Sequence, residues 1–249
     1  MAIYFLVCTK LETKIILESH EEYNKMANFI TILRMIIAFV AICLLFFQTP
    51  ACYITAFILT IIAIWFDGLD GFVARLLNES SKFGAVLDIL GDRVVENIYW
   101  IVFAVLGWIP VWVPLIVVTR GILTDGVRSI ALEQGFTAFG STTMMKTKLG
   151  HFLVASNFSR GSYAVTKALA FALMILCNFP FATMNLFLQG ADPTLSAQAT
   201  AAWGTFHNVC IAICPFAHFC VYAAVAFCVL RGLPVLIESK RFFVEDKKN

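Results

Sequence analysis

Six apolar stretches set the strongest limit on how this chain can fold. They cover residues 29–47, 51–73, 84–107, 109–131, 163–186 and 206–230. A helix needs roughly 20 mostly apolar residues to cross a bilayer, and a lipid-exposed backbone must satisfy its own hydrogen bonds. Only 14% of the 249 residues are charged, whereas soluble domains carry about 25%. We therefore expect an all-α polytopic membrane protein with six transmembrane helices.

The positions of Lys and Arg predict how these helices are oriented. Basic residues occur before the first stretch, between the second and third, between the fourth and fifth, and after the sixth. The other connections, 48–50, 107–110 and 185–204, contain neither Lys nor Arg. Because cytoplasmic loops are enriched in these residues, we expect both termini on the cytoplasmic side of the cell (inner) membrane.

The regions outside the apolar stretches complete the expected organisation. Residues 11–27 alternate apolar and charged side chains at helical spacing, which predicts an amphipathic helix on the membrane surface. The chain then divides into an N-terminal juxtamembrane segment (1–27), a membrane domain (28–231) and a basic cytoplasmic tail (232–249). The net charge of +2 is not gathered into a basic stripe, so we expect no nucleic-acid partner.

Four aspartates interrupt the apolar sequence between the second and third stretches. Asp67 and Asp70 fall on one face of a helix, and Asp88 and Asp92 are one turn apart on the next. The connection at 76–82 is short, so the two helices should be antiparallel neighbours. Their acidic faces can then meet near the cytoplasmic boundary of the membrane, which predicts a single acidic site.

Carboxylates gathered at this depth need compensating positive charge. Two of them about 5 Å apart repel by roughly 3 kcal/mol at an effective dielectric constant near 20. Oxygen ligands favour Mg²⁺, Mn²⁺ or Ca²⁺, and two such ions can clamp the oxygens of a phosphoryl displacement. The residues alone leave two alternatives open: an ion pathway, as in a cation transporter, or a structural cluster of salt bridges.

The spacing of this acidic motif resembles a known family signature. Asp67-x-x-Asp70-Gly71-x-x-Ala74-Arg75, followed by Gly84, Asp88 and Asp92 at the expected intervals, is similar to the complete signature of the CDP-alcohol phosphatidyltransferases. The resemblance implies a six-helix membrane enzyme, commonly a homodimer. Such an enzyme transfers the phosphatidyl group of a CDP-activated lipid, such as CDP-diacylglycerol, to an alcohol and releases CMP.

The resemblance also implies a role for each residue of the signature. Two divalent cations, Mg²⁺ or Mn²⁺, would be held by four ligands: Asp67, Asp70, Asp88 and Asp92. Asp92 would also be the catalytic general base. The nucleotide and its lipid would contact Asp67, Gly71, Ala74, Arg75 and Gly84, with Arg75 at the pyrophosphate.

Other parts of the sequence resemble family members that accept glycerol 3-phosphate. Asn28, Thr31 and Arg34 match their first helix, and Arg120 and Arg128 match the end of their fourth. Two arginines eight residues apart lie on nearly one face of a helix and can grip a phosphate, although arginines can also anchor a helix at the lipid headgroups. The candidate phosphate-binding residues are Arg120, Arg128, Lys146, Lys148 and Arg160. We expect transfer to glycerol 3-phosphate; serine, an inositol phosphate or a second lipid are the alternative acceptors.

Overall fold

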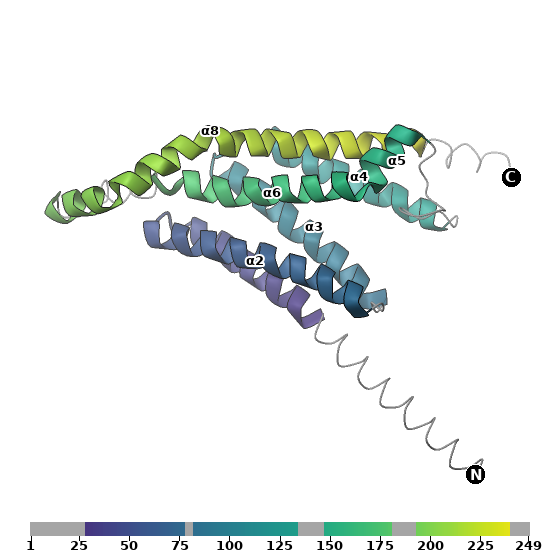
Figure 1. The fold of residues 1–249 in the computed structure, drawn as a ribbon, viewed down its shortest axis with the longest axis horizontal. Coiled ribbons are helices and arrows are strands. Elements are labelled where there is room, and N and C mark those ends of the chain that lie inside the picture. Colours follow the sequence, from purple (N-terminus) through teal and green to yellow (C-terminus); the bar gives the residue numbers. More distant parts are fainter. Residues whose placement is uncertain (1–27, 78–81, 134–146, 181–192, 240–249) are drawn as a thin grey trace, which may run out of the picture. The chain divides into compact units, whose positions relative to one another are not determined.

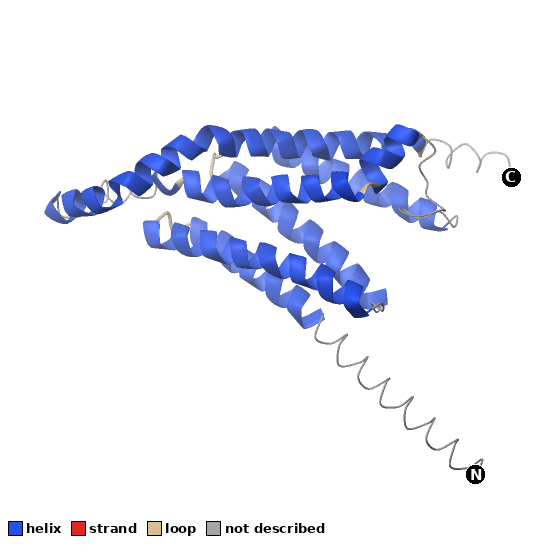
Figure 2. Ribbon diagram, viewed as in Figure 1, coloured by secondary structure: helices blue, strands red, loops and turns tan. Residues whose placement is uncertain are grey.

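The computed structural model describes residues 28–77, 82–133, 147–180 and 193–239, and every regular element in these ranges is a helix (Figure 2). The first helix covers Asn28–Leu45. It is followed by α2 (Pro50–Leu77), α3 (Lys82–Val105), α4 (Trp112–Glu133), α5 (Lys148–Ala155), α6 (Asn157–Cys177) and α8 (Pro193–Glu238) (Figure 1). The all-helical prediction is confirmed for these ranges. The amphipathic helix expected at 11–27 lies outside the described residues.

Four of the described helices contain segments that are long and apolar enough to cross a membrane: Asn28–Leu45, Pro50–Gly68, Asn157–Cys177 and Asn208–Glu238. Large apolar side chains such as Phe158 (76% exposed) and Ile122 (68% exposed) point away from the protein interior, which suits contact with lipid. The other two expected spans correspond to α3 and α4, of 24 and 22 residues. These two helices carry five and four charged residues, respectively, more than any of the four segments above, so a count of six spans stays a prediction.

Helix α8 is longer than the sequence pattern predicted. Residues 193–204 were expected within a connection, but they form the first turns of this 46-residue helix. Alanine-rich sequence favours helix, and Pro193 suits the first helical position, so the last helix begins well before the apolar stretch expected at 206–230. At the other end α8 continues to Glu238, so residues 232–238 of the expected tail are helical.

The chain divides into two compact units. The first consists of Met1–Ala41 and Ile58–Val95, and the second of Ile42–Phe57 and Glu96–Asn249. In the first unit, the first helix approaches α3 at Gly91. A Cβ atom at Gly91 would lie 3.2 Å from the Met35 sulfur and 3.4 Å from an Arg34 Nη atom. The absence of a side chain at Gly91 therefore lets Arg34 lie against α3.

In the second unit, α8 packs against α4, α5 and α6 (Figure 1). Aromatic side chains of the second unit pack α3 against α6. The rings of Tyr99 and Phe171 stack with centroids 4.7 Å apart, and the ring centroids of Trp100 and Phe171 are 4.9 Å apart. At the other end of α6, Thr147 caps α5 by accepting a hydrogen bond from the Gly150 amide. The Thr147 hydroxyl donates to the Glu238 carboxylate at the end of α8, which ties these two elements together.

Candidate active site

Arg34 is the centre of the acidic site in the first unit. Its side chain is almost fully buried, with 2% of the residue exposed, and its guanidinium contacts the Asp67 carboxylate on α2 directly. The same group lies 2.7 Å from Asp92 and 3.5 Å from Asp88 on α3. The predicted convergence of α2 and α3 carboxylates is therefore seen for three of the four aspartates, around a residue of the first helix.

The balance of charge in this cluster bears on whether it can hold a metal ion. Three carboxylates face one guanidinium, which leaves two negative charges uncompensated within this group of four side chains. Carboxylate oxygens are the ligands that Mg²⁺ and related hard cations prefer, so the donor set suits such an ion. Among the side chains described, no three His, Cys, Asp or Glu lie close enough together to hold a metal ion. The acidic cluster therefore suits a hard cation by its donor chemistry, and metal binding at these aspartates stays a prediction.

The rest of the signature is placed on the expected helices. Asp70, Gly71, Ala74 and Arg75 lie on α2, and Gly84 lies near the start of α3. The side chains of the four α2 residues lie outside the described part of the structure. Their roles in metal and nucleotide binding stay predictions.

The candidate phosphate-binding residues fall in the second unit, and the structure describes the side chains of three of them, Arg120, Arg128 and Arg160. Arg120 and Arg128 lie on α4, where Arg128 pairs with Asp125 at 3.5 Å. Arg160 lies near the start of α6 and is exposed. Lys148 begins α5 but its side chain is not described, and Lys146 lies outside the described residues.

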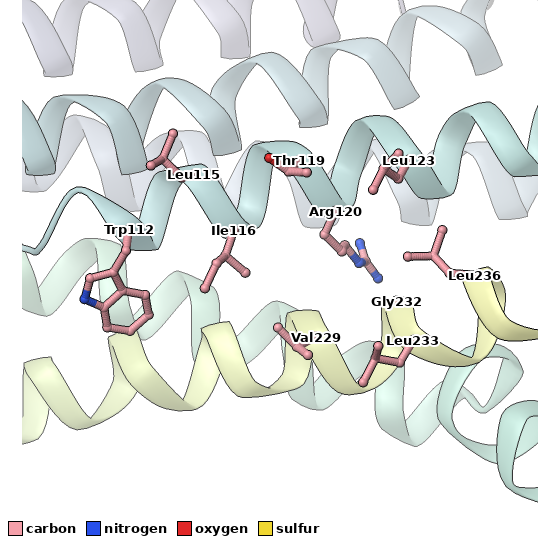
Figure 3. Close-up of a pocket in the computed structure, with 10 residues that line it drawn as sticks. All are labelled: Trp112, Leu115, Ile116, Thr119, Arg120, Leu123, Val229, Gly232, Leu233 and Leu236. Atoms are coloured by element: carbon pink, nitrogen blue, oxygen red, sulfur yellow. The ribbon is translucent and has the colours of Figure 1, made fainter.

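Arg120 is held against α8 by a close contact. A Cβ atom at Gly232 would lie 2.7 Å from the Arg120 Cγ atom and 2.9 Å from its Nε atom. Figure 3 shows the Arg120 side chain reaching from α4 toward Gly232. Only glycine leaves room for this approach, because real Cβ contacts essentially never fall below about 3.0 Å.

An apolar groove of about 390 Å³ runs beside Arg120 between α4 and α8 (Figure 3). Arg120 is the single charged side chain among the ten described residues that line it, and most of the others are Leu, Ile, Val or Trp. A cation beside an apolar groove can bind a ligand that combines a phosphate with a hydrocarbon chain.

The sequence pattern missed a second group of charged residues. Glu96 on α3 is buried (4% exposed), accepts a hydrogen bond from the Tyr163 hydroxyl, and lies 3.1 Å from the Lys167 ammonium. Arg231 on α8 is buried as well, with its guanidinium 5.7 Å from the centroid of the Tyr163 ring. A single Glu or Arg within an apolar helix was the available signal, but the pairing of these residues depends on how α3, α6 and α8 pack.

Comparison with known proteins agrees with the acidic signature. The family model described as CDP-alcohol phosphatidyltransferase matches residues 24–188. A Mycobacterium tuberculosis protein, whose name gives it provisionally as a cardiolipin synthase, is 38% identical over 88 residues, which is 35% of this chain and 42% of the relative. This chain therefore matches less than half the length of that relative.

Two further relatives are named CDP-diacylglycerol–glycerol-3-phosphate 3-phosphatidyltransferase. The Bacillus subtilis protein is 27% identical over 139 residues, covering 56% of this chain and 67% of the relative. The Cereibacter sphaeroides protein is 32% identical over 105 residues, covering 41% and 48%. Since the family model covers well over half of the sequence, including the whole aspartate signature, this chain belongs to the CDP-alcohol phosphatidyltransferase family.

Proposed function

We propose that this protein transfers the phosphatidyl group of CDP-diacylglycerol to glycerol 3-phosphate, forming phosphatidylglycerol phosphate and releasing CMP. The observation that carries the proposal is the convergence of Asp67, Asp88 and Asp92 on one buried cation within the family signature. The proposal includes an active site on the cytoplasmic side of the cell membrane and a homodimeric state.

The reaction requires a base and fixed positive charge. The acceptor hydroxyl oxygen bonds to the phosphorus of the phosphatidyl group, the bond from that phosphorus to the CMP oxygen breaks, and Asp92 accepts the hydroxyl proton. Asp67, Asp70, Asp88 and Asp92 would hold Mg²⁺ or Mn²⁺, which when bound supply positive charge for phosphoryl transfer. Arg34 adds a fixed cation that attracts the carboxylates of Asp67, Asp88 and Asp92.

The acceptor assignment depends on the arginines of the second unit. Glycerol 3-phosphate offers a phosphate that Arg120 and Arg128 can bind through paired hydrogen bonds, whereas serine offers none. Two relatives carry glycerol 3-phosphate in their names. Both lines of support favour an acceptor that contains a glycerol phosphate.

A lipid that contains glycerol phosphate is the second candidate acceptor. The apolar groove beside Arg120 is suited to an acyl chain, and the mycobacterial relative is named for a reaction that forms cardiolipin. In this case the acceptor hydroxyl would belong to phosphatidylglycerol, and the chemistry at Asp92 would be unchanged.

CMP release by the purified protein tests the proposed function. With CDP-diacylglycerol and Mg²⁺, we expect CMP to form with glycerol 3-phosphate and not with serine or inositol phosphate. EDTA should abolish the release, and added Mg²⁺ or Mn²⁺ should restore it. Release with phosphatidylglycerol alone would select the second candidate. If no acceptor led to CMP release and the protein carried cations across liposome membranes, the results would indicate a transporter and not an enzyme.

Replacing Gly232 by alanine should weaken acceptor binding through Arg120. The new Cβ atom must displace the Arg120 side chain, and we expect the KM for glycerol 3-phosphate to rise roughly fivefold, equivalent to about 1 kcal/mol. Gly126→Ala on α4 is the matched control, because a Cβ atom there meets nothing within 4 Å. If Gly232→Ala changed the KM for CDP-diacylglycerol as much, Arg120 would not be an acceptor residue.

A further inference from the structure

Glu96, Tyr163, Lys167 and Arg231 form a group in the second unit, which we call the tyrosine network; Glu96 and Arg231 are buried, and Tyr163 and Lys167 are partly exposed. The Tyr163 hydroxyl donates to one oxygen of the Glu96 carboxylate, and Lys167 donates to the other at 3.1 Å. The Tyr163 ring has two cations near it: the Lys167 ammonium at 5.6 Å from the centroid and the Arg231 guanidinium at 5.7 Å. Three helices, α3, α6 and α8, therefore meet at one aromatic ring.

Arg231 is the member of the network whose hydrogen-bonding capacity is not used. The residue is 8% exposed, and its Nε and Nη1 atoms are buried with no hydrogen-bond partner in the described part of the chain. The Arg120 Nε atom is in the same condition. Buried donors of this kind are costly, so two neighbouring arginines that retain them indicate a place for an anion.

The two arginines belong to one region of the helix pair. Arg120 packs on Gly232, the residue that follows Arg231 in α8. Arg231 also lies within electrostatic range of Arg120, Arg128 and Arg160. Positive charges that repel one another at membrane depth are stabilised when a multivalent anion binds between them.

The orientation of the Tyr163 ring decides where Arg231 points. The guanidinium is attracted to an aromatic face, and the bond from the Tyr163 hydroxyl to Glu96 limits rotation of that ring. Lys167 offsets the charge of Glu96, so this carboxylate can orient the ring without an uncompensated negative charge.

We propose that Tyr163 is a positioning residue: held by Glu96, it presents the Arg231 guanidinium, beside Arg120, to the phosphate of the acceptor alcohol. This inference rests on the proposed function, because it takes a glycerol phosphate as the ligand. It adds Arg231 to the residues that bind this phosphate and gives Glu96 and Tyr163 a role in acceptor affinity.

Steady-state kinetics of CMP release with the full chain tests the positioning role. Tyr163→Leu removes the ring, and Tyr163→Phe removes only the hydroxyl. We expect the KM for glycerol 3-phosphate to rise roughly thirtyfold in the first variant and roughly fivefold in the second. The KM for CDP-diacylglycerol should stay within about twofold of the wild-type value in both. Glu96→Gln, which can still accept the tyrosine hydrogen bond, should have a smaller effect than Glu96→Leu.

Tyr222→Phe is the matched control. This tyrosine also lies on a helix of the second unit, where its ring stacks on Trp112 at 5.9 Å, far along α8 from Arg231. Removal of its hydroxyl should leave both KM values unchanged. If the KM values for CDP-diacylglycerol and glycerol 3-phosphate rose equally in the Tyr163 variants, the tyrosine network would have only a structural role and the inference would be wrong.

Calorimetric titration of glycerol 3-phosphate separates this inference from the proposed function. The wild-type protein should bind the compound, and Tyr163→Leu and Arg231→Met should bind it at least tenfold more weakly, at unchanged thermal unfolding temperature. If the protein bound glycerol 3-phosphate in this pattern without releasing CMP, the proposed transferase reaction would be wrong, and the proposed binding of the phosphate by Arg231 would be supported. If wild-type and Arg231→Met bound it equally well or not at all, the inference would be wrong.

Discussion

Asp92→Asn is expected to reduce CMP release roughly 10²–10⁴-fold, the range typical for loss of a general base. The amide has nearly the same shape as the carboxylate, but it cannot accept the proton of the acceptor hydroxyl. Asp92 also lies 2.7 Å from Arg34, so the substitution removes one negative charge from a cluster that has an excess of them. The fold should therefore survive, and the loss should be one of chemistry.

The measurement is single-turnover CMP release with saturating glycerol 3-phosphate, paired with binding of CDP-diacylglycerol. Binding should weaken by less than about tenfold, because Asp92 is not among the residues expected to contact the donor. Asp246→Asn, in the C-terminal segment beyond α8 and outside the aspartate signature, is the control for the same chemical change and should keep full activity. Turnover of Asp92→Asn near the wild-type rate would assign the base to another residue.

Arg34→Gln is expected to lower the thermal unfolding temperature strongly in the absence of divalent cations. It leaves Asp67, Asp88 and Asp92 facing one another without their common cation. Because these carboxylates are about half exposed, we expect a loss of roughly 1–3 kcal/mol, below the ~3–5 kcal/mol typical of a fully buried pair that loses one partner.

Divalent cations should restore much of this stability. A ligand that binds only the folded protein raises the unfolding temperature as its concentration exceeds its dissociation constant. We expect Mg²⁺ to raise the unfolding temperature of Arg34→Gln more than that of the wild type, and Arg34→Lys to fall between the two. A Mg²⁺ titration that shifted neither protein would contradict a cation site at these aspartates.

The acidic site could be predicted from the sequence because it depends on local periodicity. Asp88 and Asp92 are one helical turn apart, and the short connection at 76–82 forces α2 and α3 to be antiparallel, so their acidic faces had to meet. The central position of Arg34 was not predicted as part of this site. It depends on the approach of the first helix to Gly91, which is a property of packing between segments more than 50 residues apart in sequence.

In the second unit, the sequence pattern predicted some of the functional residues and missed others. Arg120 was identified through its resemblance to phosphate-binding arginines, and its contact with Gly232 is consistent with a residue held in a defined position. Glu96, Tyr163 and Arg231 come from three different helices, so no spacing in the sequence relates them. The length of α8 was also missed, since a polar alanine-rich stretch reads equally well as a loop or as the extension of a helix.

The length of α8 has a practical consequence for topology. At 1.5 Å per residue its 46 residues extend about 69 Å, more than twice the ~30 Å thickness of the hydrocarbon layer. A helix of this length has to emerge into the aqueous phase or the headgroup zone. Cysteines introduced into its earliest turns, near Pro193, would then react with a membrane-impermeant maleimide from one side of intact cells, and the reactive side reports the insertion direction of the whole chain.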